Sequence, residues 1–538
     1  MKLKFFCHAY IISLVFYLFF IDISSYIAIS DPRLMETLAG DGAHHASILY
    51  KFVDDKIAYV RLHDIYPNNY YLISFLVYKL ITLFSSEILY TNVIISLIVT
   101  NFIFFYLLIF FSFQISFILS KNEIFSLFLV QIIFFSKSVL QEAMHIYPDI
   151  VQLSLIIIST YCLLINNKYK FELSIVFASL AFGTKFQGAV SLLFIFLFFY
   201  FYVKLPFFKK IKKIAIYLLI FFLIHLNLNP DISLYVNFFK SIFYIQNKFP
   251  QGLETQFGYE QLKIVYQFFL QEFNFYIIFL IFLPTICYFF IFFNKPKKEL
   301  IINNYLLLNI SILILILILI QLYFYRYLLQ GPRYIFHMYP FILIIASVII
   351  PFAFKSLNTP RVFFKFFSIN HILLLFFISN AIFNNQNIKS EVKYAQQLKR
   401  SINDNLIVQG GQFFEKNTIK DSVKIAAAKY SYVPSKFKYV DFDYMVKDFA
   451  LNEVQFKKYD YIFLNVDRPG VFIWPKNDDI NELKIAKFND LGKYMQSYGE
   501  KNINLEQVFV DRLFKNIGSA WELFYINPEV IILKKKRH

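Results

Sequence analysis

Cysteine is scarce in this chain of 538 residues, and its distribution excludes two common frameworks. The three cysteines, Cys7, Cys162 and Cys287, lie in or beside apolar segments and are far apart in sequence. This spacing indicates neither a disulfide framework nor a zinc cluster. The chain also lacks internal repeats and low-complexity linkers. Its first apolar segment has no small-residue cleavage site, which favours a retained membrane anchor over a removable signal peptide.

Charge is also limited, at 17% of residues, whereas 58% are hydrophobic and 71 are phenylalanine. A soluble domain of this length does not bury so much apolar surface, so we predict a polytopic membrane protein. The formal net charge is +17. In membrane proteins an excess of Lys and Arg marks the cytoplasmic loops. We therefore attribute the positive charge to membrane topology. We expect the protein to lie in a lipid bilayer and not to bind nucleic acid.

Apolar runs predict eleven membrane spans, some of them short. If the spans alternate in direction, nearly all lysine-rich loops share one side and most acidic residues share the other, as the positive-inside rule requires. The N-terminus is then cytoplasmic and the C-terminus is not. The runs cover residues 5–29, 91–119, 123–141, 149–166, 171–184, 187–203, 211–229, 273–293, 300–323, 333–354 and 362–383.

One further apolar segment, residues 70–84, decides this topology. It contains Lys79 and has only about 15 residues, which is short for a span. Counting it as a span would turn every later lysine loop outward. We predict an interfacial helix on the outer side instead. The expected fold is an all-α polytopic bundle of about 11 spans with interfacial helices in the first external loop.

The composition changes near residue 384 to mixed polar and charged residues. Residues 389–402 have a helical pattern, whereas NLIVQGG at 405–411 and YDYIFLNV at 459–466 have a strand-like pattern. We predict a transmembrane domain at residues 1–384 and a small soluble α/β domain at residues 385–538. On the predicted topology the second domain is extracytoplasmic.

Four sequence features fall on the predicted outer face: GDGAHH with Asp41, HIYPD with Asp149, FGTKFQG with Lys185, and QGPRYIFH with Arg333. In order, spacing and shared face they resemble the glycosyltransferase-C superfamily. The resemblance is to its bacterial polyprenyl-phosphate-sugar-dependent members, similar to protein O-mannosyltransferases and the lipid A aminoarabinose transferase. It covers roughly residues 1 to 385, and Tyr334 completes its Arg-Tyr feature.

The resemblance implies that Asp41 is the general base that deprotonates an acceptor hydroxyl. Cations near the interface would bind the phosphate of the lipid donor and stabilise the leaving group, and Lys185 and Arg333, with Tyr334, are the candidates. Each cation is costly in an apolar layer unless a ligand or carboxylate accompanies it. The resemblance also implies an inverting transfer. Residues expected to bind the acceptor or support the site are Asp149, His44, His45 and Glu142.

Each candidate also has a structural interpretation. Asp41 fits a helix N-cap, and Asp149 follows Pro148 at a helix start, where an acid is favourable regardless of function. Lys185 and Arg333 fit as anchors to lipid headgroups. A divalent metal is an open alternative, with His44, His45, Glu142 and His145 as candidate ligands. No cofactor is required by the sequence.

The sequence therefore predicts an integral membrane glycosyltransferase that moves a sugar from a polyprenyl-phosphate donor to lipid A, a glycan or a protein. The bacterial inner membrane is the expected location, with acceptor and C-terminal domain on the periplasmic side. One alternative is an O-antigen polymerase or ligase, but the loop at residues 230–272 lacks the arginines typical of that class. The other is a lipid-linked glycan transporter, for which repeated halves and midplane charges are expected.

Overall fold

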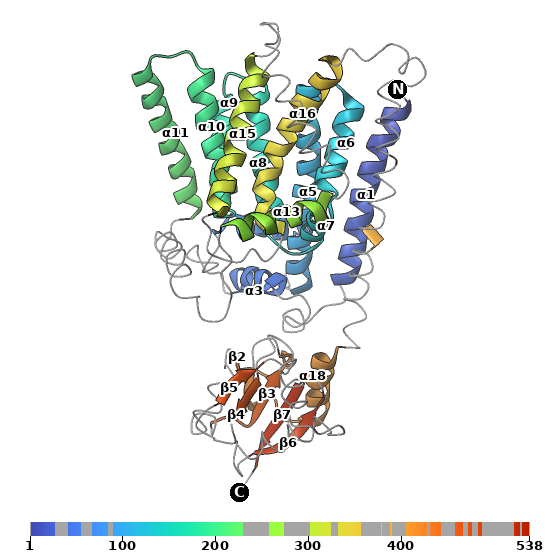
Figure 1. Cartoon of the computed structure of the whole chain (residues 1–538). Coiled ribbons are helices and arrows are strands. Elements are labelled where there is room, and N and C mark those ends of the chain that lie inside the picture. Colours follow the sequence, from blue (N-terminus) through green and yellow to red (C-terminus); the bar gives the residue numbers. More distant parts are fainter. Residues whose placement is uncertain are drawn as a thin grey trace. The chain divides into compact units, whose positions relative to one another are not determined.

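The structure is a computed structural model of the whole chain (Figure 1). It divides into two compact units, residues 1–24 with 48–394, and residues 25–47 with 395–538. The structure describes residues 2–26, 41–54, 67–83, 90–229, 258–273, 302–323, 332–356, 378, 388–389, 405–427, 431–442, 458–465, 472–475, 483–486, 521–527 and 530–536.

The first unit is a bundle of long apolar helices. Helix α5 shows why they form: its 31 residues contain no Pro, Gly or charged residue, and one side packs into the bundle while the other stays exposed. The long helices are α1 (Lys2–Tyr26), α5 (Tyr90–Ser120), α6 (Glu123–Phe134), α8 (Asp149–Leu164), α9 (Lys170–Phe182), α10 (Ala189–Tyr202), α11 (Phe207–Leu228), α15 (Ile302–Tyr323) and α16 (Tyr339–Ser356).

Nine of the eleven predicted spans coincide with described helices, and the runs at 273–293 and 362–383 fall almost entirely outside the described residues. Among the described helices, four are long and apolar enough to cross a membrane, and a broken pair would make five. α8 and α9 have 16 and 13 residues. Their lengths of about 24 and about 20 Å are below the roughly 30 Å of a hydrocarbon core.

The run predicted as a span at 123–141 does not form one continuous helix. The chain forms α6 and then α7 (Lys137–Met144), bent by 70° relative to each other. The break lies at Ser136, whose backbone is extended (φ −65°, ψ 156°). The new helix is held by a distant residue, because Glu272 accepts hydrogen bonds from the backbone N–H and the hydroxyl of Ser138.

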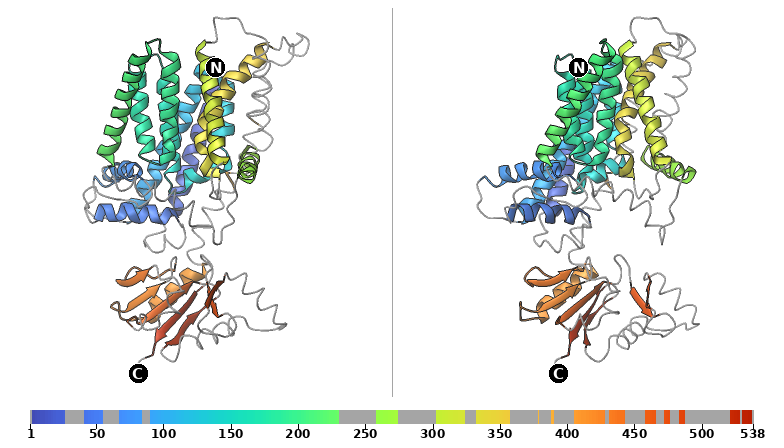
Figure 2. Two further views of the ribbon diagram at one scale, coloured as in Figure 1. Left: turned by 60° about the vertical axis from the view of Figure 1, so that its left-hand side comes forward. Right: turned by 90° about the vertical axis from the view of Figure 1, so that its left-hand side faces the viewer.

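Short helices lie across the end of the bundle opposite the N-terminus (Figures 1 and 2). One is α4 (Asn69–Ile81), whose 13 residues agree with the interfacial helix predicted at 70–84. The second half of α3 (Asp41–Asp54) packs on it, with the Phe52 and Phe75 rings 4.8 Å apart. A further short helix, α13 (Tyr259–Phe273), was not predicted.

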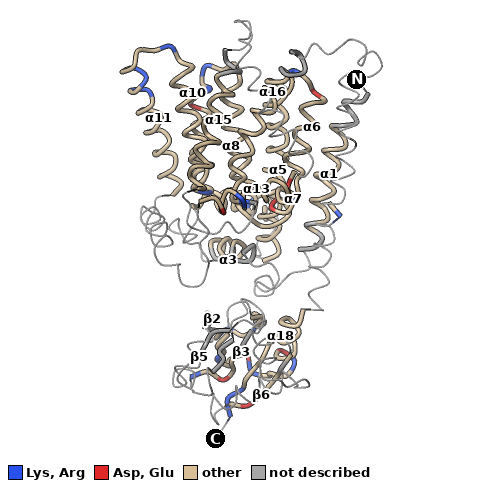
Figure 3. Tube along the Cα trace, in the orientation of Figure 1, with Lys and Arg blue, Asp and Glu red and all other residues tan. Residues whose placement is uncertain are grey.

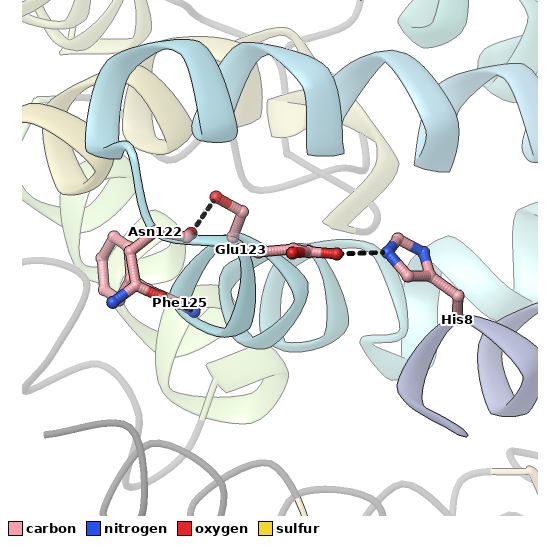
Figure 4. Close-up of polar contacts among 5 residues, drawn as sticks. His8, Asn122, Glu123 and Phe125 are labelled. Carbon is pink, nitrogen blue, oxygen red and sulfur yellow. Dashed lines mark hydrogen bonds and ion pairs between the residues drawn. The ribbon is translucent and has the colours of Figure 1, made fainter. Parts of the chain in front are cut away.

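The lysines of the bundle gather mainly at the end that carries the N-terminus (Figure 3). Glu123, the first residue of α6, has a partner on α1. His8 of α1 lies 3.2 Å from the Glu123 carboxylate at the start of α6, as Figure 4 shows. The neighbouring Asn122 caps α6 by accepting a hydrogen bond from the Phe125 N–H. This contact ties α1 to α6 at the lysine-rich end.

The second unit contains a five-stranded mixed sheet in the order β2-β1-β3-β7-β6. β1 pairs parallel with β2 and β3, and β7 pairs antiparallel with β3 and β6. β4 and β5 form a separate antiparallel pair. The strands are β1 (Lys424–Ala427), β2 (Tyr439–Phe442), β3 (Tyr461–Asn465), β4 (Phe472–Pro475), β5 (Leu483–Ala486), β6 (Trp521–Ile526) and β7 (Val530–Lys535).

One strand in this unit was predicted correctly and one wrongly. YDYIFLNV contains β3, but the predicted strand NLIVQGG begins helix α18 (Leu406–Asn417). The Asn405 side chain accepts hydrogen bonds from the N–H groups of Ile407 and Val408, which caps the helix. Gly410 and Gly411 let the helix approach the sheet and the adjacent loop. The helix predicted at 389–402 lies almost entirely outside the described residues.

Candidate functional site

A buried ion pair joins two of the predicted residues at the end of the bundle opposite the N-terminus. Lys185 Nζ lies 2.6 Å from Asp149 Oδ1, and only 6% and 4% of the two side chains are exposed. Asp149 begins α8, where the helix dipole favours an acid. A lysine charge in an apolar layer is unfavourable without a partner of opposite charge, and Asp149 is that partner for Lys185.

The turn after α9 holds Lys185 in place. α9 ends at Gly183, and the Lys185 N–H donates to the carbonyl of Ala181 (3.1 Å). Gln152, one turn into α8, donates from Nε2 to the Lys185 carbonyl (2.8 Å). Gly188 brings the following 3-10 helix η1 (Phe186–Gly188) against α9, since a Cβ there would lie 2.4 Å from the Ala181 carbonyl carbon. The lysine backbone is therefore fixed by both neighbouring helices.

The 3-10 helix η4 (Pro332–Met338) brings the second predicted cation to the same place. Lys185 Nζ is 5.7 Å from the centre of the Tyr334 ring, and Arg333 Cζ is 5.4 Å from it. Arg333 also lies over the Tyr147 ring, at 5.1 Å. Tyr334 therefore has a cation within cation–π range from each of two separate elements.

Two carboxylates balance the charge of Arg333. The guanidinium interacts electrostatically with Glu142 of α7 and with Asp149, and it hydrogen bonds Tyr334. His145 follows α7, and burial together with the positive charge of Arg333 lowers its pKa to about 4. Its imidazole is therefore neutral near pH 7. Two cations and two carboxylates are thus held together in a region of low polarity.

A cavity of about 390 Å³ adjoins this cluster. Tyr334 and His337 of η4 lie in its wall together with Phe186 of η1. Most of the remaining wall comes from apolar side chains of α10 and α15, namely Ala189, Val190, Leu193, Ile314, Leu317, Ile318 and Leu322. Such a lining fits an apolar chain whose polar end reaches the cations.

Sequence reasoning missed several residues that build this site. Gln152 supports Lys185, and Tyr147 stacks on Arg333. Asn101 of α5 donates to the His145 carbonyl (2.5 Å) and hydrogen bonds Tyr70 of α4. Tyr147 lies two residues before Asp149 in the quoted HIYPD stretch. Asn101 and Tyr70 are distant in sequence, and no local pattern marks them.

The remaining predicted residues lie at the start of α3, in the segment that follows α1. Asp41 is the first residue of α3, but its side chain and that of His44 fall outside the part of the chain that the structure describes. The His45 side chain is buried. Among the described residues, no three His, Cys, Asp or Glu side chains come together as metal ligands. The roles of Asp41, His44 and His45, and the metal alternative, stay predictions.

Comparison with known proteins identifies the fold. The sequence matches no protein family model and no curated protein. The structure, however, superimposes on the crystal structure of ArnT from Cupriavidus metallidurans bound to undecaprenyl phosphate, with a TM-score of 0.51, 9% identity and 98% of each chain covered. The chain shares the ArnT fold. The apo form of ArnT matches with a TM-score of 0.48 and 9% identity, over 87% of this chain and 96% of ArnT.

ArnT is the lipid A aminoarabinose transferase of the glycosyltransferase-C superfamily. The resemblance inferred from Asp41, Asp149, Lys185 and Arg333 is therefore confirmed at the level of the fold. The likeness to ArnT extends over both units, including the C-terminal domain that the sequence resemblance did not cover. At 9% identity the likeness concerns architecture.

Proposed function

We propose that this protein is an integral membrane glycosyltransferase that takes one sugar from a polyprenyl-phosphate donor and transfers it to a hydroxyl group of an acceptor. The observation that carries this proposal is the buried Lys185–Asp149 ion pair, with Arg333 nearby and a largely apolar cavity whose wall includes Tyr334, the ring that both cations approach. A polyprenyl-phosphate sugar combines the same two chemistries, an anionic phosphate and a long apolar tail.

The two cations bind the donor phosphate. Burying Lys185 and half-burying Arg333 is unfavourable, and the carboxylates of Asp149 and Glu142 offset that cost when no donor is bound. An arriving phosphate supplies the same negative charge. As the bond between sugar and phosphate breaks, charge builds on the leaving oxygen, and cations held in advance stabilise it. The Tyr334 ring lies within cation–π distance of both Lys185 and Arg333 and holds the two cations close together.

The cavity between α10 and α15 receives the first part of the lipid tail. Its wall is largely aliphatic and aromatic, and Tyr334 and His337 bring it next to the cations. The bound undecaprenyl phosphate of ArnT supports this class of donor. The tail remains in an apolar environment while its phosphate reaches the charged residues.

Asp41 is the proposed general base. A carboxylate at the start of α3 removes the acceptor proton as the acceptor oxygen attacks the anomeric carbon. Attack from the face opposite the phosphate inverts the configuration at that carbon. Asp149, Glu142, His44 and His45 support the site or contact the acceptor, which is lipid A, another envelope glycan or a protein. We place the reaction on the periplasmic side of a bacterial inner membrane, with the N-terminus in the cytoplasm.

A transfer assay tests this proposal. The purified protein in lipid nanodiscs is given a panel of radiolabelled polyprenyl-phosphate sugars and an envelope extract as acceptor. Asp41→Asn is expected to bind the donor with wild-type affinity but to lose transfer by about 100-fold or more, the lower range of general-base contributions. Asp31→Asn, in the same loop, is the matched control and should retain transfer. Near-normal turnover by Asp41→Asn would remove Asp41 as the base.

A metal requirement is measured in the same assay. Among the described residues, Glu142 and His145 lie near Arg333, but no three His, Cys, Asp or Glu side chains come together as metal ligands. Loss of transfer with a chelator and recovery with a divalent ion would establish a metal role, with His44 and His45 as the next ligands to vary.

A further inference from the structure

The first turn of α4 is fastened to the ends of two other helices by buried asparagines. The N–H of Asn68 donates to Asn229 Oδ1 at the end of α11 (2.5 Å), and the N–H of Asn69 donates to the Gly183 carbonyl at the end of α9 (3.0 Å). The first N–H groups of a helix lack partners within that helix. Asn68 forms no side-chain cap, so α9 and α11 supply the acceptors here.

The two asparagine side chains also bind each other. Asn229 Nδ2 donates to Asn69 Oδ1 (3.1 Å), and Asn69 Nδ2 donates to the Leu180 carbonyl (3.0 Å). Both residues are fully enclosed, at 2% exposure for Asn69 and 1% for Asn229. Gly183 leaves no space for a side chain, since a Cβ there would lie 2.2 Å from Asn69 Nδ2. We call Asn69, Asn229 and Gly183 the asparagine clamp.

The clamp contacts the turn after α9 that contains Lys185. The Leu180 carbonyl that receives Asn69 also accepts a hydrogen bond from the Thr184 hydroxyl (2.9 Å), one residue before the lysine. The next residue of α4, Tyr70, is 1% exposed and interacts electrostatically with Asp149. The start of α4 therefore contacts both the turn that carries Lys185 and the carboxylate that pairs with it.

The same helix continues the first external loop. Phe75 of α4 packs on Phe52 of α3 at 4.8 Å, and α3 is the helix that begins at Asp41. The backbone contacts of the clamp thus join α4, and through Phe75 the second half of α3, to the turn that contains a proposed phosphate ligand. Holding reacting groups in a fixed geometry contributes a large part of enzymatic rate enhancement, and a misplacement of 1 Å is able to cost 100-fold.

The geometry points to Asn69 and Asn229 as positioning residues for transfer: the asparagine clamp sets the first external loop against the Lys185 turn. This inference rests on the proposed function. No clamp residue lines the described cavity, so the clamp acts on the rate through α4. Loss of the clamp is therefore expected to lower kcat while the affinity for the donor changes little.

The experiment compares Asn69→Ala, Asn229→Ala, the double variant and Gly183→Ala with the wild type in nanodiscs. Asn227→Ala is the matched control, because Asn227 is exposed on α11 two residues from Asn229 and bonds only its own helix (Leu223 carbonyl, 2.6 Å). Three quantities are measured: kcat for transfer, the Kd for undecaprenyl phosphate, and hydrogen exchange of the α4 backbone amides.

We expect each single variant to lower kcat by at least tenfold, with Kd within threefold of the wild type and faster exchange in the first turn of α4. The double variant should be little worse than the worse single variant, because both residues act through one contact. Asn227→Ala should match the wild type. A kcat within twofold of the wild type for both Asn69→Ala and Asn229→Ala, or an equal loss in Asn227→Ala, would overturn the inference.

Hydrogen exchange separates failure of this inference from failure of the proposed function. If the wild type transfers no sugar from any donor, the proposed function fails, and the clamp as a positioning device for transfer fails with it. If transfer occurs but α4 exchange is unchanged in Asn229→Ala, the clamp does not hold α4, and only the inference is overturned. Faster exchange with unchanged kcat would reduce the clamp to a structural contact and also refute the inference.

Discussion

Removing Asp149 should destabilise the protein, and undecaprenyl phosphate should restore most of the loss. In Asp149→Asn the charge of Lys185 loses the partner 2.6 Å away while it stays 6% exposed. Breaking a buried ion pair from one side costs about 3–5 kcal/mol, because the remaining charge is uncompensated. Removing both charges in Asp149→Asn/Lys185→Met should cost much less than the single change, since no unpaired lysine remains.

The donor phosphate offers a replacement for the lost carboxylate. A ligand at 100 times its Kd stabilises the folded state by about 2.7 kcal/mol. In the wild type the phosphate competes with Asp149 for Lys185, whereas in Asp149→Asn it meets an unpaired cation. We therefore expect undecaprenyl phosphate to bind Asp149→Asn more tightly and to stabilise it more than the wild type at the same concentration.

The assay is unfolding by SDS titration in mixed micelles, with and without undecaprenyl phosphate. Glu172→Gln is the control, because Glu172 lies at the start of α9, the end of that helix away from Lys185, and accepts a hydrogen bond from Tyr217 (3.3 Å). It should change stability by about 1 kcal/mol or less and should not alter the lipid response. Equal stabilisation of the wild type and Asp149→Asn, or a double variant less stable than the single one, would refute the phosphate site.

Three further results follow from the described contacts. Glu272→Ala should destabilise the protein by about 1–3 kcal/mol in the same titration, because the buried Ser138 N–H and hydroxyl lose their acceptor; an unchanged midpoint would refute this role. Because the folded pKa of His145 is about 4, against 6.5 for the ordinary side chain, stability should fall as pH falls from about 6.5 to 4. Stability is measured as the melting temperature at each pH. In His145→Gln the melting temperature should depend less on pH than in the wild type, and an equal pH dependence in the two proteins would contradict the lowered pKa of His145. Glu123→Gln, which breaks the partly exposed His8 contact, should cost no more than about 1 kcal/mol and leave transfer unchanged.

Apolar runs made the long helices predictable. α5 lies within a residue or two of the run at 91–119, and a short helix at the position of α4 was expected because Lys79 and the short length of the segment argue against a span. The prediction failed at Ser136, where a contact with Glu272, 134 residues away from Ser138, supports a new helix. Hydropathy is calculated from neighbouring residues along the chain, so it does not detect a contact between residues that are distant in sequence.

The candidate site was predictable in part. The sequence indicated that Lys185 needed a ligand or a carboxylate partner, but only the fold identifies Asp149 as that partner. In the C-terminal unit, NLIVQGG has a strand-like composition, and the Asn405 cap with helix packing on the sheet outweighs it. The asparagine clamp was missed because its members, such as Asn69 and Asn229, are separated by more than a hundred residues.

The most direct test of the account follows both products of one reaction with the wild-type protein. A polyprenyl-phosphate sugar, labelled on the sugar, is incubated with the protein in nanodiscs and an envelope acceptor, and the lipid and acceptor fractions are separated. The account predicts that label appears on the acceptor while polyprenyl phosphate is released in equal amount. Donor lipid that binds but keeps its sugar, or that moves between leaflets intact, would contradict it.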